Sequence, residues 1–207
     1  MAPSRRPRRD LVLLSGGVDS AVALWLAVEA GRDVVALTLH YPERPAREVE
    51  ATQALAARAG VRLVEADLPF LREAQARGAS IAPPMGYVAA RNATMYAVAV
   101  HVADGLARET IVGGHNADDA ARFPDAAAGW LARLDALLRE GLWAGDGRAT
   151  PALEFPLLSM PKPRVLQEAA RLGVPLDLTW SCYEDGASPC GACPACASSH
   201  ASARGVA

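Results

Sequence analysis

The chain has 207 residues, of which 51% are hydrophobic and 21% charged, and this composition is typical of one α/β domain with a small appendage. No apolar stretch approaches the ~20 residues of a membrane helix, and the arginine-rich start is not followed by the long apolar segment of a secretory signal. We therefore expect a cytoplasmic protein that contacts no membrane.

Residues 1–9 are expected to form a disordered basic tail, because they contain two prolines and four arginines. Removing these four charges from the formal net charge of −2 leaves −6 for the rest of the chain. A basic tail can bind nucleic acid, but a few charges on an acidic body more often form a solvated end. Nucleic-acid binding is therefore not expected.

Between residues 10 and 175, apolar strands alternate with helices. Strands are expected at 11–14, 34–39, 62–67, 109–113 and 152–157, and helices at 20–30, 46–59, 92–106, 126–139 and 163–172. This alternation predicts a doubly wound parallel sheet, in which ligands bind beyond the carboxyl ends of the strands. The segments 15–20, 40–41 and 114–119 should converge there, and the loop from 72 to 88 is long enough to form a lid.

The first strand runs directly into a glycine turn and a helix, in the sequence LVLLSGGVDS of residues 11–20. Two glycines allow backbone N–H groups to converge on an anion, and the N-terminus of the following helix favours a phosphate group. The carboxylate of Asp19 would repel that phosphate unless a Mg²⁺ lay between them. The expected phosphate-binding residues are Leu14, Ser15, Gly16, Gly17, Val18, Asp19 and Ser20.

The spacing of this turn differs from the P-loop and from the dinucleotide-binding motif. It resembles the S-G-G-x-D-S loop of the ATP pyrophosphatases (PP-loop enzymes), which have an adenine nucleotide α-hydrolase-like fold. Those enzymes cleave ATP between the α- and β-phosphates and adenylate an oxygen atom. The alternative is a strand-to-helix turn whose glycines serve packing alone.

All four cysteines of the chain lie in the segment 176–207, with the spacing C-x7-C-x2-C-x2-C. Such steps let a chain wrap a tetrahedral metal, and four thiolates favour a structural Zn²⁺. Two disulfides and an iron–sulfur cluster are the alternatives, and disulfides are rare in the cytoplasm. We expect a zinc knuckle formed by Cys182, Cys190, Cys193 and Cys196.

Together, the loop and the cysteine segment resemble the 7-cyano-7-deazaguanine synthase (QueC-like) family over roughly residues 11–200. Four more segments carry the resemblance: YVAARN at 87–92, GGHNADD at 113–119 with FPD at 123–125, PLLSMPK at 156–162, and TWSCY at 179–183 with CGACPAC at 190–196.

The resemblance implies a carbon–nitrogen ligase of queuosine biosynthesis that acts as a homodimer. Such an enzyme activates 7-carboxy-7-deazaguanine with ATP, adds ammonia to form an amide, and dehydrates the amide to the nitrile. Asp19 would hold Mg²⁺, and Lys162, the only lysine, would neutralise charge on the phosphates. The implied substrate-binding residues are Arg91, Asn92, Asn116, Asp119 and Asp125. His115 is either a proton acceptor or a structural residue.

Three departures from the family pattern fall where the substrate is expected to bind. They bear on which molecule accepts the activated acyl group. Ala89 replaces a proline, residues 126–127 are Ala-Ala where the family has Cys-Arg, and residues 197–198 are Ala-Ser where it has Leu-Arg. An enzyme that stops at the amide, or that conjugates a deazaguanine to a protein or nucleic acid, is therefore an alternative. A non-catalytic nucleotide- or RNA-binding module is an alternative of another class.

Overall fold

The computed structural model describes residues 6–42, 44–72, 87–143 and 150–197. Five parallel strands form one sheet in the order β3-β2-β1-β4-β5. They are β1 (Arg9–Leu13), β2 (Asp33–His40), β3 (Arg62–Asp67), β4 (Thr110–Val112) and β5 (Ala152–Glu154). The strand order reverses between β1 and β4, so the predicted doubly wound sheet is confirmed, and a ligand site is expected at the carboxyl ends of those two strands.

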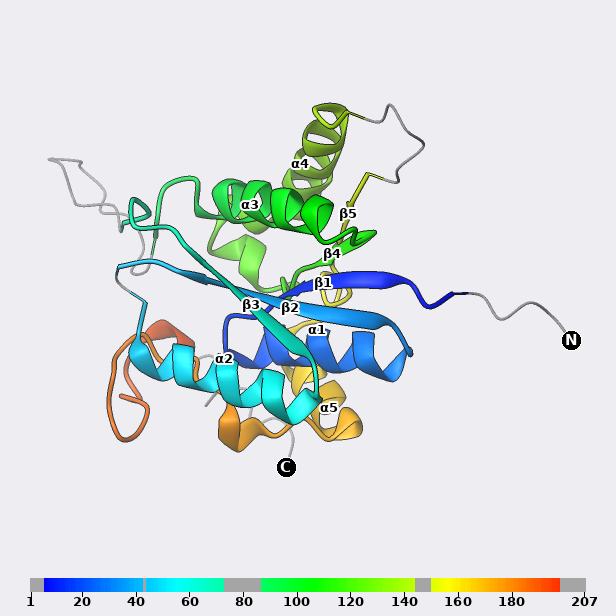
Figure 1. The fold of residues 1–207 in the computed structure, drawn as a ribbon. Helices are drawn as coiled ribbons and strands as arrows, with labels where there is room; N and C mark the ends of the chain where they lie inside the picture. The colour runs from blue at the N-terminus through cyan, green and yellow to red at the C-terminus, as the bar shows by residue number, and fades with distance from the viewer. Residues whose placement is uncertain (1–5, 43, 73–86, 144–149, 198–207) are drawn as a thin grey trace, which may run out of the picture.

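Helices cover both faces of the sheet (Figure 1). On one face lie α1 (Val18–Glu29), α2 (Ala46–Ala59) and α5 (Lys162–Leu172), and on the other lie α3 (Arg91–Gly105) and α4 (Ala128–Glu140). The first layer buries Leu24 and Val165 against the sheet, and the second buries Tyr96 and Leu131. None of the described helices is long and apolar enough to cross a membrane.

The ten expected elements are present, and the boundaries differ where local geometry intervenes. Helix α4 begins at Ala128 rather than at 126, because Pro124–Ala126 form a short 3₁₀ turn. It is the second of three among the described residues, the others being Asp119–Ala121 and Leu176–Leu178. Strand β5 ends at Glu154 rather than at 157. The proposed lid falls largely on residues 73–86, which lie outside the described part of the chain.

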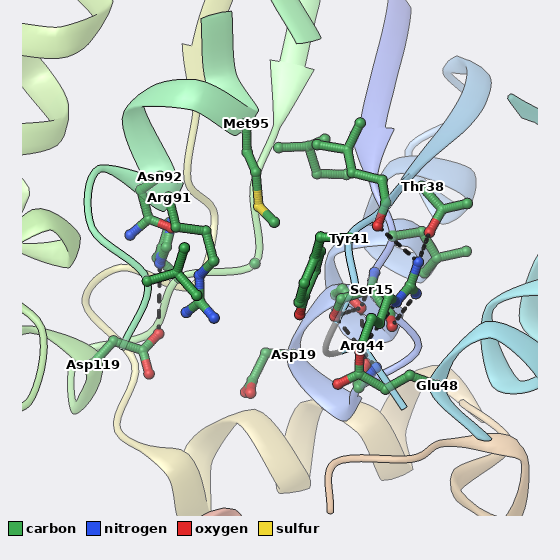
Figure 2. Close-up of a pocket in the computed structure, with 18 of the residues that line it drawn as sticks. Ser15, Asp19, Thr38, Tyr41, Arg44, Glu48, Arg91, Asn92, Met95 and Asp119 are labelled. Atoms are coloured by element: carbon green, nitrogen blue, oxygen red, sulfur yellow. Dashed lines mark hydrogen bonds and ion pairs between the residues drawn. The ribbon is translucent and has the colours of Figure 1, made fainter. Parts of the chain in front are cut away.

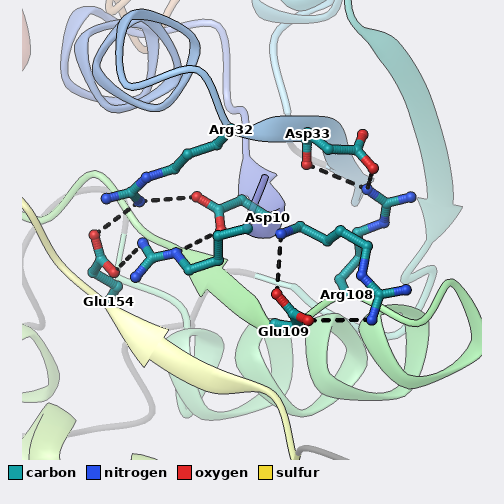
Figure 3. A network of polar contacts seen from close by, with 8 residues as sticks. Asp10, Arg32, Asp33, Arg108, Glu109 and Glu154 are labelled. Atoms are coloured by element: carbon teal, nitrogen blue, oxygen red, sulfur yellow. Dashed lines mark hydrogen bonds and ion pairs between the residues drawn. The ribbon is translucent and has the colours of Figure 1, made fainter. Parts of the chain in front are cut away.

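The amino ends of β1, β2 and β4, together with Glu154 of β5, carry a network of ion pairs away from the expected site (Figure 3). Asp10 is fully buried, and its carboxylate accepts hydrogen bonds from Arg8 Nε at 3.1 Å and Arg32 Nη1 at 2.9 Å. Arg8 and Arg32 also pair with Glu154 of β5. The expectation of a disordered tail up to residue 9 is therefore wrong for Arg8 and Arg9, because β1 begins at Arg9 and Arg8 satisfies a buried carboxylate.

Candidate active site

A cavity of about 360 Å³ opens where β1, β2 and β4 end, at the point where the strand order reverses (Figure 2). A second cavity of about 320 Å³ adjoins it. Five residues line both cavities: Asp19, Asp119, Phe123, Ser181 and Tyr183. The expected convergence of the segments 15–20, 40–41 and 114–119 is confirmed, because Ser15, Tyr41 and His115 all line the larger cavity.

The glycine turn after β1 is held in one shape by its own hydrogen bonds. The Ser20 hydroxyl donates to Gly17 O at 2.9 Å and accepts from Ser15 N at 3.2 Å. Gly16 has a φ of +95°, and a Cβ there would lie 2.5 Å from Glu48 O on α2. Only glycine fits this close approach, so the loop is a preformed cradle with the N-terminus of α1 behind it.

Five of the seven expected phosphate-binding residues line the larger cavity: Leu14, Ser15, Gly17, Asp19 and Ser20. The other two support the loop from behind. Gly16 faces α2, and the side chain of Val18 is buried in the core between α1 and the sheet.

Lys162 lies at the start of α5, and its ammonium donates to Asp19 Oδ2 at 2.6 Å. The backbone N–H of Lys162 also donates to Asp118 Oδ2 at 2.8 Å, which fixes the start of the helix. Lys162 is only 8% exposed, so its charge is confined to the mouth of the loop. Asp19 Oδ1 is buried and receives no hydrogen bond from the described residues, which leaves one carboxylate oxygen available to a cation.

Arg44 is a residue that the sequence analysis missed. Its side chain is 3% exposed, and it ties the loop to β2 and α2. A guanidinium has five N–H donors, and they are accepted by Glu48 Oε2 (3.2 Å), Thr38 Oγ1 (2.7 Å), Leu39 O (3.0 Å), Ser15 O (2.8 Å) and Thr52 Oγ1 (2.8 Å). The signal in the sequence was an Arg–Glu pair four residues apart, directly after a strand that ends at the site.

Glu48, the partner of Arg44 on α2, also lines the larger cavity. Burial raises the pKa of Glu48, and the charge of Arg44 offsets that rise only in part. The ion pair is therefore enclosed at the edge of the cavity, where it supports the loop from the side of β2.

Arg91 and Asn92 open α3 and line the larger cavity, as the sequence analysis expected of substrate-binding residues. The Arg91 guanidinium lies 5.9 Å from the ring centre of Phe123. Asn92 is buried, and its amide donates to the backbone carbonyl of Asp125 at 3.2 Å. Asp125 itself lines neither of the two cavities, so in this structure its carbonyl positions Asn92.

Asn116 and Asp119 follow β4 and face the smaller cavity. Asn116 N donates to Asp119 Oδ2 at 2.9 Å, and Asn116 Oδ1 accepts from Asp118 N at 2.8 Å. His115 lines the larger cavity, with its Nδ1 at 3.8 Å from Asp119 Oδ2. These hydrogen bonds fold the segment into a tight turn that presents polar side chains to both cavities.

The sulfur atoms of the four cysteines lie within 4.8 Å of one another, and no pair is joined in a disulfide. A tetrahedral ion with Zn–S bonds of about 2.3 Å needs sulfurs about 3.8 Å apart, and two of the pairs here are at 4.0 Å. Three of the cysteines are buried. The cluster is therefore compatible with a bound metal, and the disulfide alternative is not borne out.

The cysteine segment is joined directly to the glycine loop. Trp180 packs beside the cysteines and against Ala51 of α2, and its backbone N–H donates to Gly16 O at 2.9 Å. Ser181 Oγ would lie 3.4 Å from a Cβ placed on Gly17. The position of the loop thus depends on the fold of this segment.

The chain matches the family model described as "Queuosine biosynthesis protein QueC" over residues 9–205. It is 35% identical to a protein of Synechococcus sp. (strain CC9605) named 7-cyano-7-deazaguanine synthase, over 91% of this chain and 89% of the relative. The resemblance identified from the sequence motifs is confirmed.

Solved structures share the fold at lower identity. The NMN synthetase from Francisella tularensis superposes with a TM-score of 0.51 at 19% identity, over 87% of this chain and 68% of that protein. The U34-tRNA thiolase NcsA from Methanococcus maripaludis gives a TM-score of 0.53 at 15% identity, over 99% of this chain and 67% of that protein. The sheet, its helices and the matching family model establish that the chain belongs to the QueC family of queuosine biosynthesis proteins.

Proposed function

We propose that this chain is a 7-cyano-7-deazaguanine synthase, a ligase that uses ATP and ammonia to convert 7-carboxy-7-deazaguanine to its nitrile. The observation that carries the proposal is the Lys162–Asp19 pair at the mouth of a preformed glycine loop. A carboxylate is a poor electrophile at neutral pH, and adenylation turns one of its oxygens into a leaving group. The loop and Lys162 stabilise the charge that develops on the phosphates during that step.

Asp19 would hold a Mg²⁺ through Oδ1, the buried oxygen that lacks a hydrogen-bond partner among the described residues. When bound, the ion neutralises charge between this carboxylate and the phosphates. Ser15, Gly17 and Ser20 orient the phosphates toward the start of α1. Lys162 is held beside them by its ion pair with Asp19.

The deazaguanine is expected to bind where the two cavities meet. Phe123 and Tyr183 line both cavities and offer flat apolar surface to a bicyclic ring. Asn116, Asp119 and Asp125 suit the amino, N–H and carbonyl groups of a guanine-like edge, although Asp125 would act through Asn92 in the geometry seen here. The Arg91 guanidinium, over the ring of Phe123, is suited to the substrate carboxylate.

The four cysteines would hold a structural Zn²⁺, because a complete thiolate set leaves no open position for chemistry. Metal analysis of the purified protein tests this assignment: one zinc per chain supports it, and iron with an absorbance of an iron–sulfur cluster contradicts it. We also expect a cytoplasmic homodimer. The exposed Leu137 and Trp143, at and beyond the end of α4, support association, and light scattering in solution tests it.

The decisive experiment follows nucleotide and base together by mass spectrometry, with ATP, Mg²⁺, ammonium and 7-carboxy-7-deazaguanine. AMP and the nitrile are the expected products. An amide that accumulates without nitrile would favour the enzyme that stops at the amide or passes the acyl group to another acceptor. This alternative has one structural basis: Ala126, where the family pattern has cysteine, lines the larger cavity. The absence of both AMP and a deazaguanine product would contradict the proposal.

A further inference from the structure

His115 is placed in the larger cavity by the backbone around it. The preceding Gly114 packs against the first turn of α1, where a Cβ would lie 2.8 Å from Ser20 N and 2.9 Å from the carbonyl carbon of Asp19. His115 lines the same cavity as the glycine loop. Its imidazole therefore lies beside the residues that are proposed to bind the phosphates of ATP.

The ring of His115 is held by aromatic neighbours on two sides. Its centre lies 5.8 Å from the ring of Tyr96 on α3 and 5.7 Å from the ring of Phe155, which follows β5. The side chain is 17% exposed. Tyr96 is fully enclosed, and burial raises its pKa, so its hydroxyl stays neutral beside the imidazole. Among the described residues, the charged group with a recorded contact to the ring is the Asp119 carboxylate.

Asp119 is fixed as an anion. Burial raises the pKa of Asp119, but the nearby His115 imidazole, the hydrogen bond from Asn116 N–H and the charge of Lys162 outweigh burial and hold it below its usual range. Nδ1 of His115 faces this carboxylate, which favours a proton on Nδ1 and makes Nε2 the acceptor nitrogen. The separation of 3.8 Å exceeds a hydrogen bond, and at this distance the anion stabilises the imidazolium that forms when Nε2 takes a proton.

The two carboxylates other than Asp119 that line the larger cavity are held in ion pairs. Asp19 is paired with Lys162, and Glu48 is paired with Arg44. His115 is the only imidazole among the described residues that line either cavity.

The proposed reaction needs a proton acceptor in both of its stages, and in each stage the protons leave the same nitrogen atom. When ammonia attacks the adenylated carboxyl, its nitrogen must lose a proton as the C–N bond forms and AMP leaves. When the amide oxygen has been adenylated, the same nitrogen loses its two remaining protons, one to give the neutral imidate and one as the C≡N bond forms and the C–O bond to AMP breaks. One base beside that nitrogen therefore serves both steps.

We propose that Nε2 of His115 is this base, with Asp119 as its positioning residue. The proposal rests on the proposed function, since it names the proton acceptor of that reaction. General-base catalysis of this kind contributes about 10²- to 10⁴-fold to a rate.

The test uses the full chain supplied with ATP, Mg²⁺ and the amide intermediate, so that nitrile formation is measured alone. His115→Ala should lower kcat by about 10²- to 10⁴-fold, while KM for ATP stays within about twofold because phosphate binding uses other residues. The limb of the pH–rate profile that falls toward acid should disappear, and added imidazole should restore part of the rate. His101→Gln, on the exposed side of α3, is the matched control and should keep the wild-type rate.

Asp119→Asn should keep the fold and lower kcat less than His115→Ala does, because the imidazole remains but loses its anion. A His115→Ala protein that retains the wild-type kcat and acid limb overturns the proposal. So does one whose loss of rate follows a loss of ATP affinity or thermal stability and is not rescued by imidazole. A wild-type protein that makes neither amide nor nitrile would overturn the proposed function and this role with it.

Discussion

Lys162 and Asp19 lie 143 residues apart in the chain, yet their charged groups meet at 2.6 Å. One comes from the start of α5 and the other from the first turn of α1, and these two helices pack side by side on the same face of the sheet. The pair joins the only lysine of the chain to the loop that is suited to phosphate. The ammonium group of Lys162 is therefore held in place before any nucleotide binds.

Replacing this lysine should impair chemistry more than folding. We expect Lys162→Met to lower kcat by about 10²- to 10³-fold, as expected when one preorganised donor to a developing anion is lost. Steady-state release of AMP measures the effect. The control is Arg164→Met on the same helix, whose side chain is 57% exposed and which should retain its activity. Equal losses in the two variants would show that α5, rather than the ammonium, is responsible.

Lysine should not be able to replace Arg44, although the two side chains carry the same charge. An ammonium has three donors and cannot satisfy the five acceptors that surround the guanidinium, so buried oxygens would lose their partners. We expect Arg44→Lys to reduce the free energy of unfolding by about 2 kcal/mol and to weaken ATP binding, because Ser15 O is one of those acceptors.

Urea denaturation and calorimetric titration with ATP measure the two effects of Arg44→Lys. Arg58→Lys, on the exposed last turn of the same helix α2, is the matched control. Unchanged stability and affinity in Arg44→Lys would mean that the loop keeps its shape without these bonds.

The parts of the site that follow from local patterns could be predicted from the sequence. The glycine loop, the cysteine spacing and the alternation of strands and helices each depend on residues close together in the chain. Arg44 was missed because its partners Thr38, Thr52 and Ser15 become neighbours only when β1, β2 and α2 pack. Gly16 was expected to bind phosphate, and the structure adds a second role, because a Cβ there would lie 2.5 Å from Glu48 O on α2. Such roles depend on tertiary approach, which no local pattern encodes.

Removing the metal proposed for the four cysteines should weaken ATP binding, although the cysteines do not line the larger cavity. The segment that carries them donates the hydrogen bond from Trp180 N to Gly16 O. A loss of about 1 kcal/mol from this one bond corresponds to about fivefold weaker binding of ATP. We expect Cys193→Ser, or treatment with a chelator, to lower Tm and to raise the Kd for ATP. Normal ATP affinity in a metal-free protein of lowered Tm would show that loop and knuckle are independent.

The ion-pair network that contains Glu154 should make the free energy of unfolding depend on pH in the acidic range. Burial raises the pKa of Glu154, but the hydrogen bonds and charges of Arg32 and Arg8 lower it further, so the folded pKa lies below the ordinary value. The unfolded chain then binds a proton more readily than the folded one. The contribution of this carboxylate to the free energy of unfolding is therefore fully present above about pH 5. It is lost as the pH falls through the pKa of the folded state.

Glu154→Gln removes that dependence, because glutamine does not ionise. We expect it to lower the free energy of unfolding at pH 7 by about 0.5–1 kcal/mol, since the carboxylate is partly exposed. Between pH 5 and pH 3 the difference from wild type should shrink, as urea denaturation at a series of pH values would show. Glu140→Gln, on the exposed end of α4, should leave the profile unchanged. A difference that stayed constant down to pH 3 would mean that the contribution of Glu154 comes from packing, because only its charge can be titrated away.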